Sequence, residues 1–155
     1  MENQDKHTES LEMIRSFFTD KIRFNQVLGL EIILLDPHQV KIRFPMKEQL
    51  IGNFLRGTLH GGVIASALDV AGGLISFLSL LQKFEGKSDA EKQKALGRLG
   101  TIDMRVDFLR PGYGREFVAT AFILRAGNKV VVSRMELHNE EQTLIAVGTG
   151  TYFIS

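Results

Sequence analysis

Residues 59–81 read LHGGVIASALDVAGGLISFLSLL, and Asp69 is the only residue among these 23 with a side chain that is charged at neutral pH. A segment of this length and composition is long enough to cross a bilayer. A carboxylate near its middle costs about 3 kcal/mol on insertion, however, and four glycines lower its hydrophobicity. A helix that is hydrophobic all round is otherwise a core helix wrapped by the rest of the protein. The stretch therefore predicts one long buried helix, from about residue 61 to 84, rather than a membrane span.

Short stretches of alternating hydrophobic and polar residues flank this helix, as expected of strands with one buried face. Two precede the helix and four follow it: 30–35, 40–44, 101–110, 117–125, 130–138 and 144–154. In the first strand after the helix, the predicted apolar face consists of Ile102, Met104, Val106 and Phe108. A curved antiparallel sheet wrapped around the apolar helix would bury these faces, so the sequence predicts an α+β fold.

Two further segments lie outside this pattern. Residues 8–22 predict an amphipathic N-terminal helix, since hydrophobic residues recur there at helical spacing. Residues 82–99 carry eight charged side chains and predict a solvated connection or a short helix. No repeat or Pro/Ser-rich linker divides the chain. Residues 1–155 are therefore expected to form a single domain, with residues 1–23 as an N-terminal helical extension.

The overall composition excludes several classes of protein. Lys and Arg number 19 against 18 for Asp and Glu, a net charge of +1, which is too even for a nucleic-acid-binding face. The chain has no cysteine, so disulfides, thiolate metal sites and a cysteine nucleophile are excluded. The first ten residues lack the basic start and apolar run of a signal peptide. We therefore expect a cytoplasmic protein without a membrane span.

Small and polar residues share one face of the predicted helix. They follow one another at steps of 4, 3, 4 and 3: Gly62, Ser66, Asp69, Gly73 and Ser76. A carboxylate in such apolar surroundings needs a partner or a chemical role. Asp69 could simply bond a neighbouring group and fix the helix in place, or it could be a reacting carboxylate.

The start of the helix favours the second interpretation. Glycines at positions 61 and 62 leave main-chain N–H groups unobstructed where a helix N-terminus attracts developing negative charge. Asn53, in the preceding loop, offers a neutral amide donor. His60 either caps the helix or takes part in the site. No histidine or acid lies at metal-ligand spacing from it, so neither a metal nor a cofactor is expected.

These residues resemble a known family. The sequence is similar to the hotdog-fold acyl-CoA thioesterases of the phenylacetyl-CoA thioesterase (PaaI-like) family, with a closer match to its YigI-type bacterial branch. Asn53, the His60-Gly61-Gly62 run and Asp69 carry the resemblance, which extends over residues 24–154. Three blocks of sequence match: 59–69, 100–111 and 124–129. The connection at 82–99 is longer than in the shorter members of the family.

The resemblance implies a hotdog fold that pairs as a homodimer or homotetramer, with active sites between subunits. One chain would supply Asn53 and the Gly61 N–H, aided by His60, to polarise a thioester carbonyl. Asp69 of the other chain would attack the carbonyl or activate water, two roles that the sequence leaves open. Thr101 matches a family residue that positions the water, and Gly62 belongs to the substrate-binding residues.

The implied activity is hydrolysis of a medium- or long-chain fatty acyl-CoA to the free fatty acid and CoA. Aryl-CoA hydrolysis of the phenylacetyl type, an acyl-thioester hydratase and a non-catalytic acyl-CoA-binding module are the alternatives. The chain has no phosphate-binding loop, so basic side chains must hold the CoA phosphates. Arg125 and Lys129, which flank a predicted hairpin turn, and Arg110 are the candidates.

Overall fold

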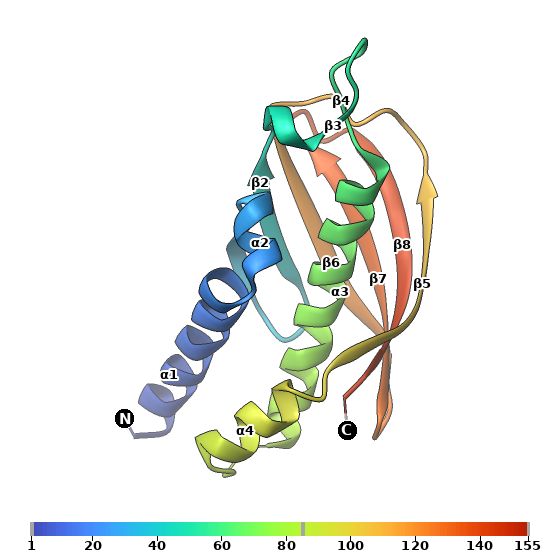
Figure 1. Cartoon of the computed structure of the whole chain (residues 1–155). Coiled ribbons are helices and arrows are strands. Elements are labelled where there is room, and N and C mark those ends of the chain that lie inside the picture. Colours follow the sequence, from blue (N-terminus) through green and yellow to red (C-terminus); the bar gives the residue numbers. More distant parts are fainter. Residues whose placement is uncertain (1, 85, 155) are drawn as a thin grey trace.

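A six-stranded antiparallel sheet curves around the long helix α3 (Gly61–Lys83) in the computed structural model (Figure 1), which describes residues 2–84 and 86–154. The strand order is β1-β2-β6-β7-β8-β5. The six strands are β1 (Glu31–Leu35), β2 (Val40–Pro45), β5 (Gly100–Phe108), β6 (Glu116–Ala126), β7 (Val130–Asn139) and β8 (Leu144–Phe153). A small hairpin of β3 (Ile51–Asn53) and β4 (Thr58–Leu59) precedes α3. The predicted α+β fold is confirmed.

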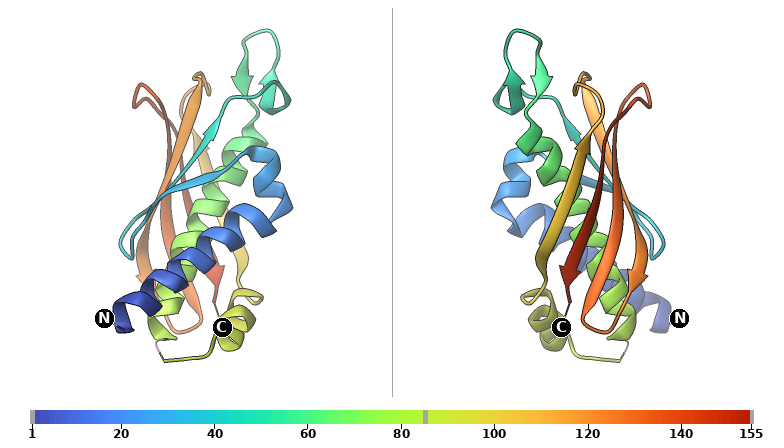
Figure 2. Two further views of the ribbon diagram at one scale, coloured as in Figure 1. Left: turned by 90° about the vertical axis from the view of Figure 1, so that its left-hand side faces the viewer. Right: turned by 90° about the vertical axis from the view of Figure 1, so that its right-hand side faces the viewer.

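Helix α3 lies along the inner face of the sheet (Figure 2). Its residues 61–81 have the length and hydropathy of a membrane span, but 72% of the most apolar window is buried inside the protein. Leu68, Leu74 and Phe77 are fully buried and contribute to one hydrophobic core, which extends from Ile14 to Ile154. The helix is therefore the core helix that the sequence predicts.

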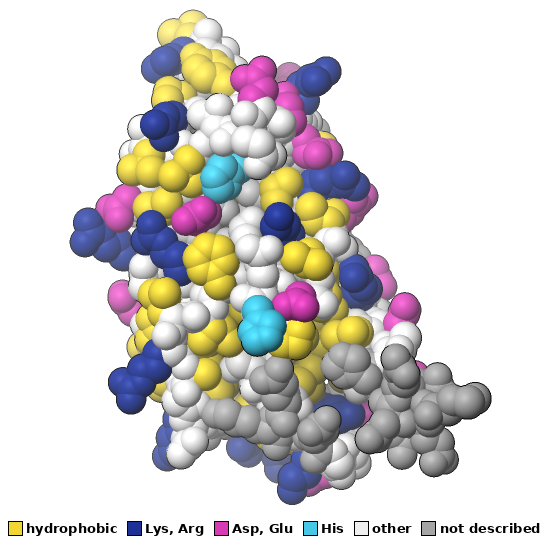
Figure 3. All heavy atoms as spheres, turned by 180° about the vertical axis from the view of Figure 1, so that it is seen from behind, with side chains coloured by type: hydrophobic (Ala, Val, Ile, Leu, Met, Phe, Trp, Pro, Cys, Tyr) yellow, Lys and Arg dark blue, Asp and Glu magenta, His cyan; other side chains and the backbone are white. Residues whose placement is uncertain are grey.

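The strand pairing sets which residues face α3. Phe44 of β2 lies opposite Phe117 of β6, and their rings stack 5.4 Å apart. Both are fully buried, as are Met135 and Leu137 of β7. The other face of these strands, turned away from α3, carries acidic and basic side chains among hydrophobic ones (Figure 3). Each of these strands therefore has one solvent-exposed and one buried face, which explains the alternation of hydrophobic and polar residues in the sequence.

The N-terminal helical segment is longer than predicted. It comprises α1 (Glu2–Ser16), a π-helical turn (Phe17–Lys21) and α2 (Arg23–Leu28), which ends at Gly29 in a left-handed conformation. Phe18 packs its ring 6.5 Å from that of Phe77 in α3, and Arg15 donates to the carbonyl oxygen of Ile32 over 2.6 Å. The segment therefore anchors to both α3 and the sheet.

The charged connection contains a short helix, α4 (Asp89–Leu96), in the part of 82–99 that the structure describes; Glu85 lies outside it. Ser88 accepts from the main-chain N–H of Glu91, and the Glu91 carboxylate accepts from that of Ser88. This reciprocal capping box explains why a helix begins at this point. Leu96 is buried, so the end of α4 is tied to the core.

Strand β5 departs from its predicted alternation. Its pairing with β8 shifts register between Thr101 and Asp103, and Ile102 and Phe108 are 58% and 57% exposed. The expectation of one continuous buried face is therefore wrong at both ends of the strand. The reason is its position: β5 lies at the edge of the sheet and pairs with β8 alone.

Candidate active site

Asp69 lies in the third turn of α3 and faces the β5–β8 pair. Its Oδ1 accepts a hydrogen bond from Thr101 Oγ1 over 2.9 Å and another from the Tyr152 hydroxyl over 3.2 Å. The same hydroxyl lies 3.2 Å from the main-chain oxygen of Asp69. The carboxylate is partly buried and held from two strands.

Tyr152 is a member of this cluster that the sequence did not reveal as a site residue. It is 1% exposed, and burial, reinforced by the charge of Asp69, holds the pKa of its phenol well above the ordinary value. The hydroxyl therefore stays protonated and remains a donor. A signal was present in the sequence: Tyr152 follows Gly150 on the same face of a strand, where a large ring needs the space that a glycine leaves.

The beginning of α3 is capped by His60. Its Nδ1 accepts from the main-chain N–H of Gly62 over 2.8 Å. A neutral ring that accepts through Nδ1 carries its proton on Nε2, so Nε2–H is left as a donor. Of the two glycine N–H groups expected at the helix start, the one of Gly62 is occupied. The Gly61 N–H is the donor at the helix terminus that His60 leaves open.

Gly61 opens onto a cleft of about 360 Å³ at this end of the sheet. The cleft lies between the start of α3 and the segment that follows β5. Its walls include Leu59, Ile64, Phe108, Leu109 and Arg110. A Cβ atom at position 61 would approach the Phe108 ring to 3.4 Å, so the ring lies directly beside the helix start. The cleft thus combines an apolar wall with a main-chain donor.

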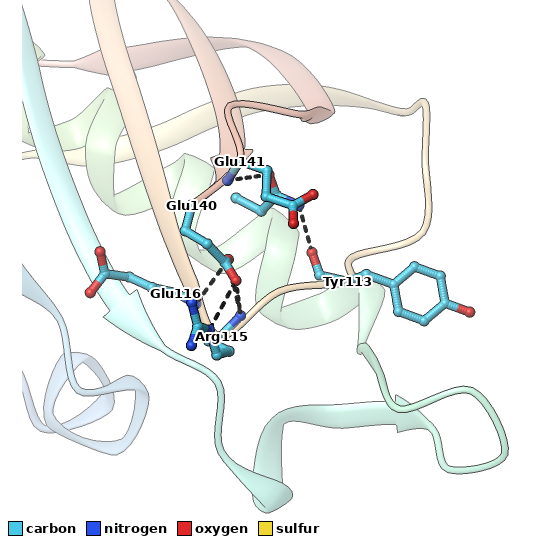
Figure 4. A network of polar contacts seen from close by, with 6 residues as sticks. Tyr113, Arg115, Glu116, Glu140 and Glu141 are labelled. Atoms are coloured by element: carbon cyan, nitrogen blue, oxygen red, sulfur yellow. Dashed lines mark hydrogen bonds and ion pairs between the residues drawn. The ribbon is translucent and has the colours of Figure 1, made fainter.

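A polar network holds the segment that directly follows the cleft residues Pro111 and Gly112 (Figure 4). The Glu140 carboxylate accepts from the main-chain N–H of Arg115, and Asn139 Nδ2 donates to the carbonyl oxygen of Tyr113 over 2.9 Å. Hydrogen bonds from the main-chain N–H groups of Glu140 itself and of Arg115 hold the pKa of the Glu140 carboxyl below its usual range. Arg56 Nε donates to the Tyr113 hydroxyl over 3.0 Å and so ties the β3–β4 hairpin to the same segment.

Asn53 is exposed at the end of β3. Its Oδ1 accepts from the main-chain N–H of Arg56 over 3.2 Å, while its NH₂ group makes no hydrogen bond with any residue that the structure describes. Gly61 and Asp69 are eight residues apart on α3, which is about 12 Å along the axis of a helix. One chain therefore does not bring Gly61 and Asp69 to the same point.

The three basic candidates are divided between the two ends of the sheet. Arg110 borders the cleft, and its Nη1 donates to the Leu144 carbonyl oxygen over 2.8 Å. Arg125 and Lys129 are exposed on the β6–β7 hairpin. Phe153 pairs with both Val130 and Gly100, so this hairpin lies where β5 begins, at the end of the sheet opposite the cleft (Figure 1). Among the described residues, no group of three His, Asp or Glu side chains could hold a metal ion.

Comparison with known proteins places the chain among thioesterases. A family model described as "Thioesterase superfamily" matches residues 56–146. The medium/long-chain acyl-CoA thioesterase YigI of Escherichia coli (strain K12) is 47% identical over 146 residues, which are 94% of each chain.

Two solved structures show the same relationship. A Shewanella oneidensis protein related to the thioesterase superfamily superposes with a TM-score of 0.90 at 47% identity, covering 96% of this chain and 97% of that one. A mutant form of the phenylacetic acid degradation protein PaaI from Thermus thermophilus gives a TM-score of 0.65 at 25% identity, covering 86% of this chain and 99% of that one.

Proposed function

Because this chain belongs to the thioesterase superfamily, we propose that it hydrolyses medium- and long-chain fatty acyl-CoA to the free fatty acid and CoA. The preference for medium and long acyl chains rests on the 47% identity to YigI across 94% of both chains. The aligned part of the chain includes the start of α3 and Asp69. The geometry is compatible with this chemistry: a main-chain donor opens onto an apolar cleft, and a carboxylate is held by two hydroxyl groups.

We propose further that the active site forms between two chains. Two α3 helices run antiparallel when a two-fold axis perpendicular to them relates the two chains. If that axis passes beside Ala65, midway between Gly61 and Asp69, then Gly61 of one chain lies beside Asp69 of the other. This arrangement removes the separation of about 12 Å that exists within one chain. Two such sites would form per dimer.

The exposed edge of the sheet supports the same arrangement. Strand β5 has a partner on one side only, and Ile102 and Phe108 expose large apolar side chains on it. Unpaired edge strands favour association with another chain. Antiparallel pairing of β5 with a second β5 would cover this edge and continue the sheet across a homodimer. A homotetramer would be a dimer of such dimers.

In this site the Gly61 N–H, the Asn53 amide and the Nε2–H of His60 would donate to the thioester carbonyl oxygen, where negative charge develops. As a general base, Asp69 of the second chain would take a proton from water while the hydroxide adds to the carbonyl carbon. As a nucleophile, it would form an anhydride that water then cleaves. In both cases the C–S bond breaks and CoA leaves as a thiolate, which takes up a proton.

The CoA phosphates would lie against basic side chains at the mouth of the site. Arg110 of one chain borders the cleft. Because the second chain runs in the opposite direction, its β6–β7 hairpin, with Arg125 and Lys129, would lie at the same end as that cleft. The absence of cysteine is consistent with a reducing compartment, and we propose a cytoplasmic location on that basis.

The experiment that tests the function is a thiol-release assay across acyl-CoAs of increasing chain length, with phenylacetyl-CoA beside them. We expect kcat/KM to rise from short to medium and long acyl chains. Preference for phenylacetyl-CoA would favour aryl-CoA hydrolysis instead. Tight binding of acyl-CoA without thiol release would identify a binding module, and hydration of an unsaturated acyl-CoA would identify a hydratase.

A further inference from the structure

We propose that Tyr152 is a positioning residue for Asp69, holding one oxygen of the carboxylate so that the other faces the thioester. This inference rests on the proposed function, in which Asp69 is the reacting carboxylate. It concerns a residue of the last strand, far from the helix start in sequence and fully enclosed by the core.

The two hydroxyl groups that reach Asp69 come from directly paired residues. Thr101 of β5 and Tyr152 of β8 are register partners in the sheet. Thr101 donates to Oδ1 over 2.9 Å, and the Tyr152 hydroxyl shares its one proton between Oδ1 and the main-chain oxygen of Asp69, each 3.2 Å away. No described residue donates to Oδ2. The sheet therefore holds Oδ1 at two points and leaves Oδ2 as the oxygen available for attack on the carbonyl or for taking a proton from water.

The fold makes room for the phenol at two separate places. A Cβ atom on Gly72 of α3 would lie far closer to the Tyr152 hydroxyl oxygen than van der Waals contact allows. A Cβ atom on Gly150 of β8 would lie 2.7 Å from the same oxygen. Glycines on two elements thus clear the space around the hydroxyl group itself. A phenylalanine would fill the ring volume without bringing a polar group into the core, which indicates that the hydroxyl is used.

A fixed carboxylate is an advantage for the reaction. An exposed Asp side chain rotates about its last bond and presents either oxygen, whereas hydrogen bonds to Oδ1 select one orientation. Thr101 lies on the edge strand and is exposed, so Tyr152 supplies the buried and more constrained of the two contacts.

The substitution Tyr152→Phe tests the proposal, because it keeps the ring and removes only the hydroxyl group. We expect kcat to fall about tenfold or more, because the variant loses one hydrogen bond to a charged group. KM should change less than about twofold. Ser76→Ala is the matched control. Ser76 is also fully buried, and its hydroxyl donates to the Gly72 carbonyl oxygen over 2.7 Å on the same helix. Its loss removes a comparable hydrogen bond without touching Asp69, so kcat should stay at the wild-type value.

Thermal unfolding supplies a readout that does not depend on activity. If the contact with the carboxylate exists in solution, Tyr152→Phe should lower Tm clearly more in the wild-type background than in Asp69→Ala. A Tyr152→Phe variant with the kcat of Ser76→Ala would overturn the proposal, and so would one that fails to fold. If the wild-type protein releases no thiol while the Tm coupling persists, the proposed function is wrong and the pair is purely structural.

Discussion

The main-chain N–H of Gly62 donates to Nδ1 of His60 over 2.8 Å, so the first turn of α3 is capped by an imidazole. Loss of an N-cap side chain costs about 1 kcal/mol. We expect His60→Ala to lower Tm by about 2–4 °C. His60→Asn should restore most of the loss, because Asn also caps helices well, but it lacks the Nε2–H donor. Scanning calorimetry of both variants gives the contribution of the cap to Tm, and their kcat values give the contribution of the Nε2–H donor to the reaction. Equal Tm values for His60→Ala and wild type would contradict the capping role.

Asp69→Ala is expected to abolish thioester hydrolysis and to leave a folded oligomer. The side chain is partly exposed and its two hydrogen-bond donors are hydroxyl groups, so its removal leaves no buried charge unpaired. Thiol release and size-exclusion chromatography measure the two outcomes. A variant that kept the wild-type kcat/KM would assign Asp69 a structural role.

Mixing two inactive variants tests whether sites are shared between chains. Asp69→Ala and Asn53→Ala chains, unfolded and refolded together, should recover part of the wild-type activity, since half of the sites in a mixed dimer would carry both native residues. Each variant refolded alone is the control. Mixed dimers that form, as shown by tagged subunits, and remain inactive would place Asn53 and Asp69 in the same chain's site.

Simultaneous replacement of Arg125 and Lys129 by Ala should raise KM for acyl-CoA several-fold and leave kcat nearly unchanged, because uniform binding of the nucleotide is lost. The pair lies on an exposed hairpin, so stability should not change. A short acyl thioester without the nucleotide is the control substrate. Equal losses on both substrates would contradict a role in holding the phosphates.

The adjacent glycines Gly72 and Gly73 of α3 should respond in opposite ways to alanine. A Cβ atom at position 72 would collide with the Tyr152 hydroxyl, and overpacking of this kind costs about 1–3 kcal/mol. At position 73 the nearest atom would lie 3.8 Å away, so the gain in helix propensity, up to about 1 kcal/mol, remains. We expect Tm to fall for Gly72→Ala and to rise for Gly73→Ala. A fall in Tm for both would show that the helix packs more closely at Gly73 than the structure indicates.

Much of this fold could be predicted from local patterns. The apolar run at 61–81 identified the core helix, and alternation located all six strands of the main sheet. These patterns mispredicted burial where the exposure of a residue depends on which strands lie beside its own. The exposed Ile102 and Phe108 belong to an edge strand, and strand order is not encoded in the alternation of one strand.

The candidate site was only partly predictable for the same reason. His60, Gly61 and Gly62 are neighbours in sequence, so their geometry follows from one helix start. Tyr152 reaches Asp69 from 83 residues away through the register of β5 and β8. Spacing along one helix could not show such a contact, and the distribution of Asn53 and Asp69 between two chains stays a prediction.

The hydropathy of α3 has a consequence for the synthesis of the chain. The helix is complete at Lys83, but most of its packing partners belong to β6, β7 and β8, which follow it. At 5–20 residues per second, the 70 residues that follow Lys83 up to Phe153, where β8 ends, take about 4–14 s to synthesise. During this interval the nascent chain displays an apolar helix that passes the length and hydropathy criteria of a membrane span. Until β6, β7 and β8 cover it, this apolar surface favours aggregation and is of the kind that chaperones shield.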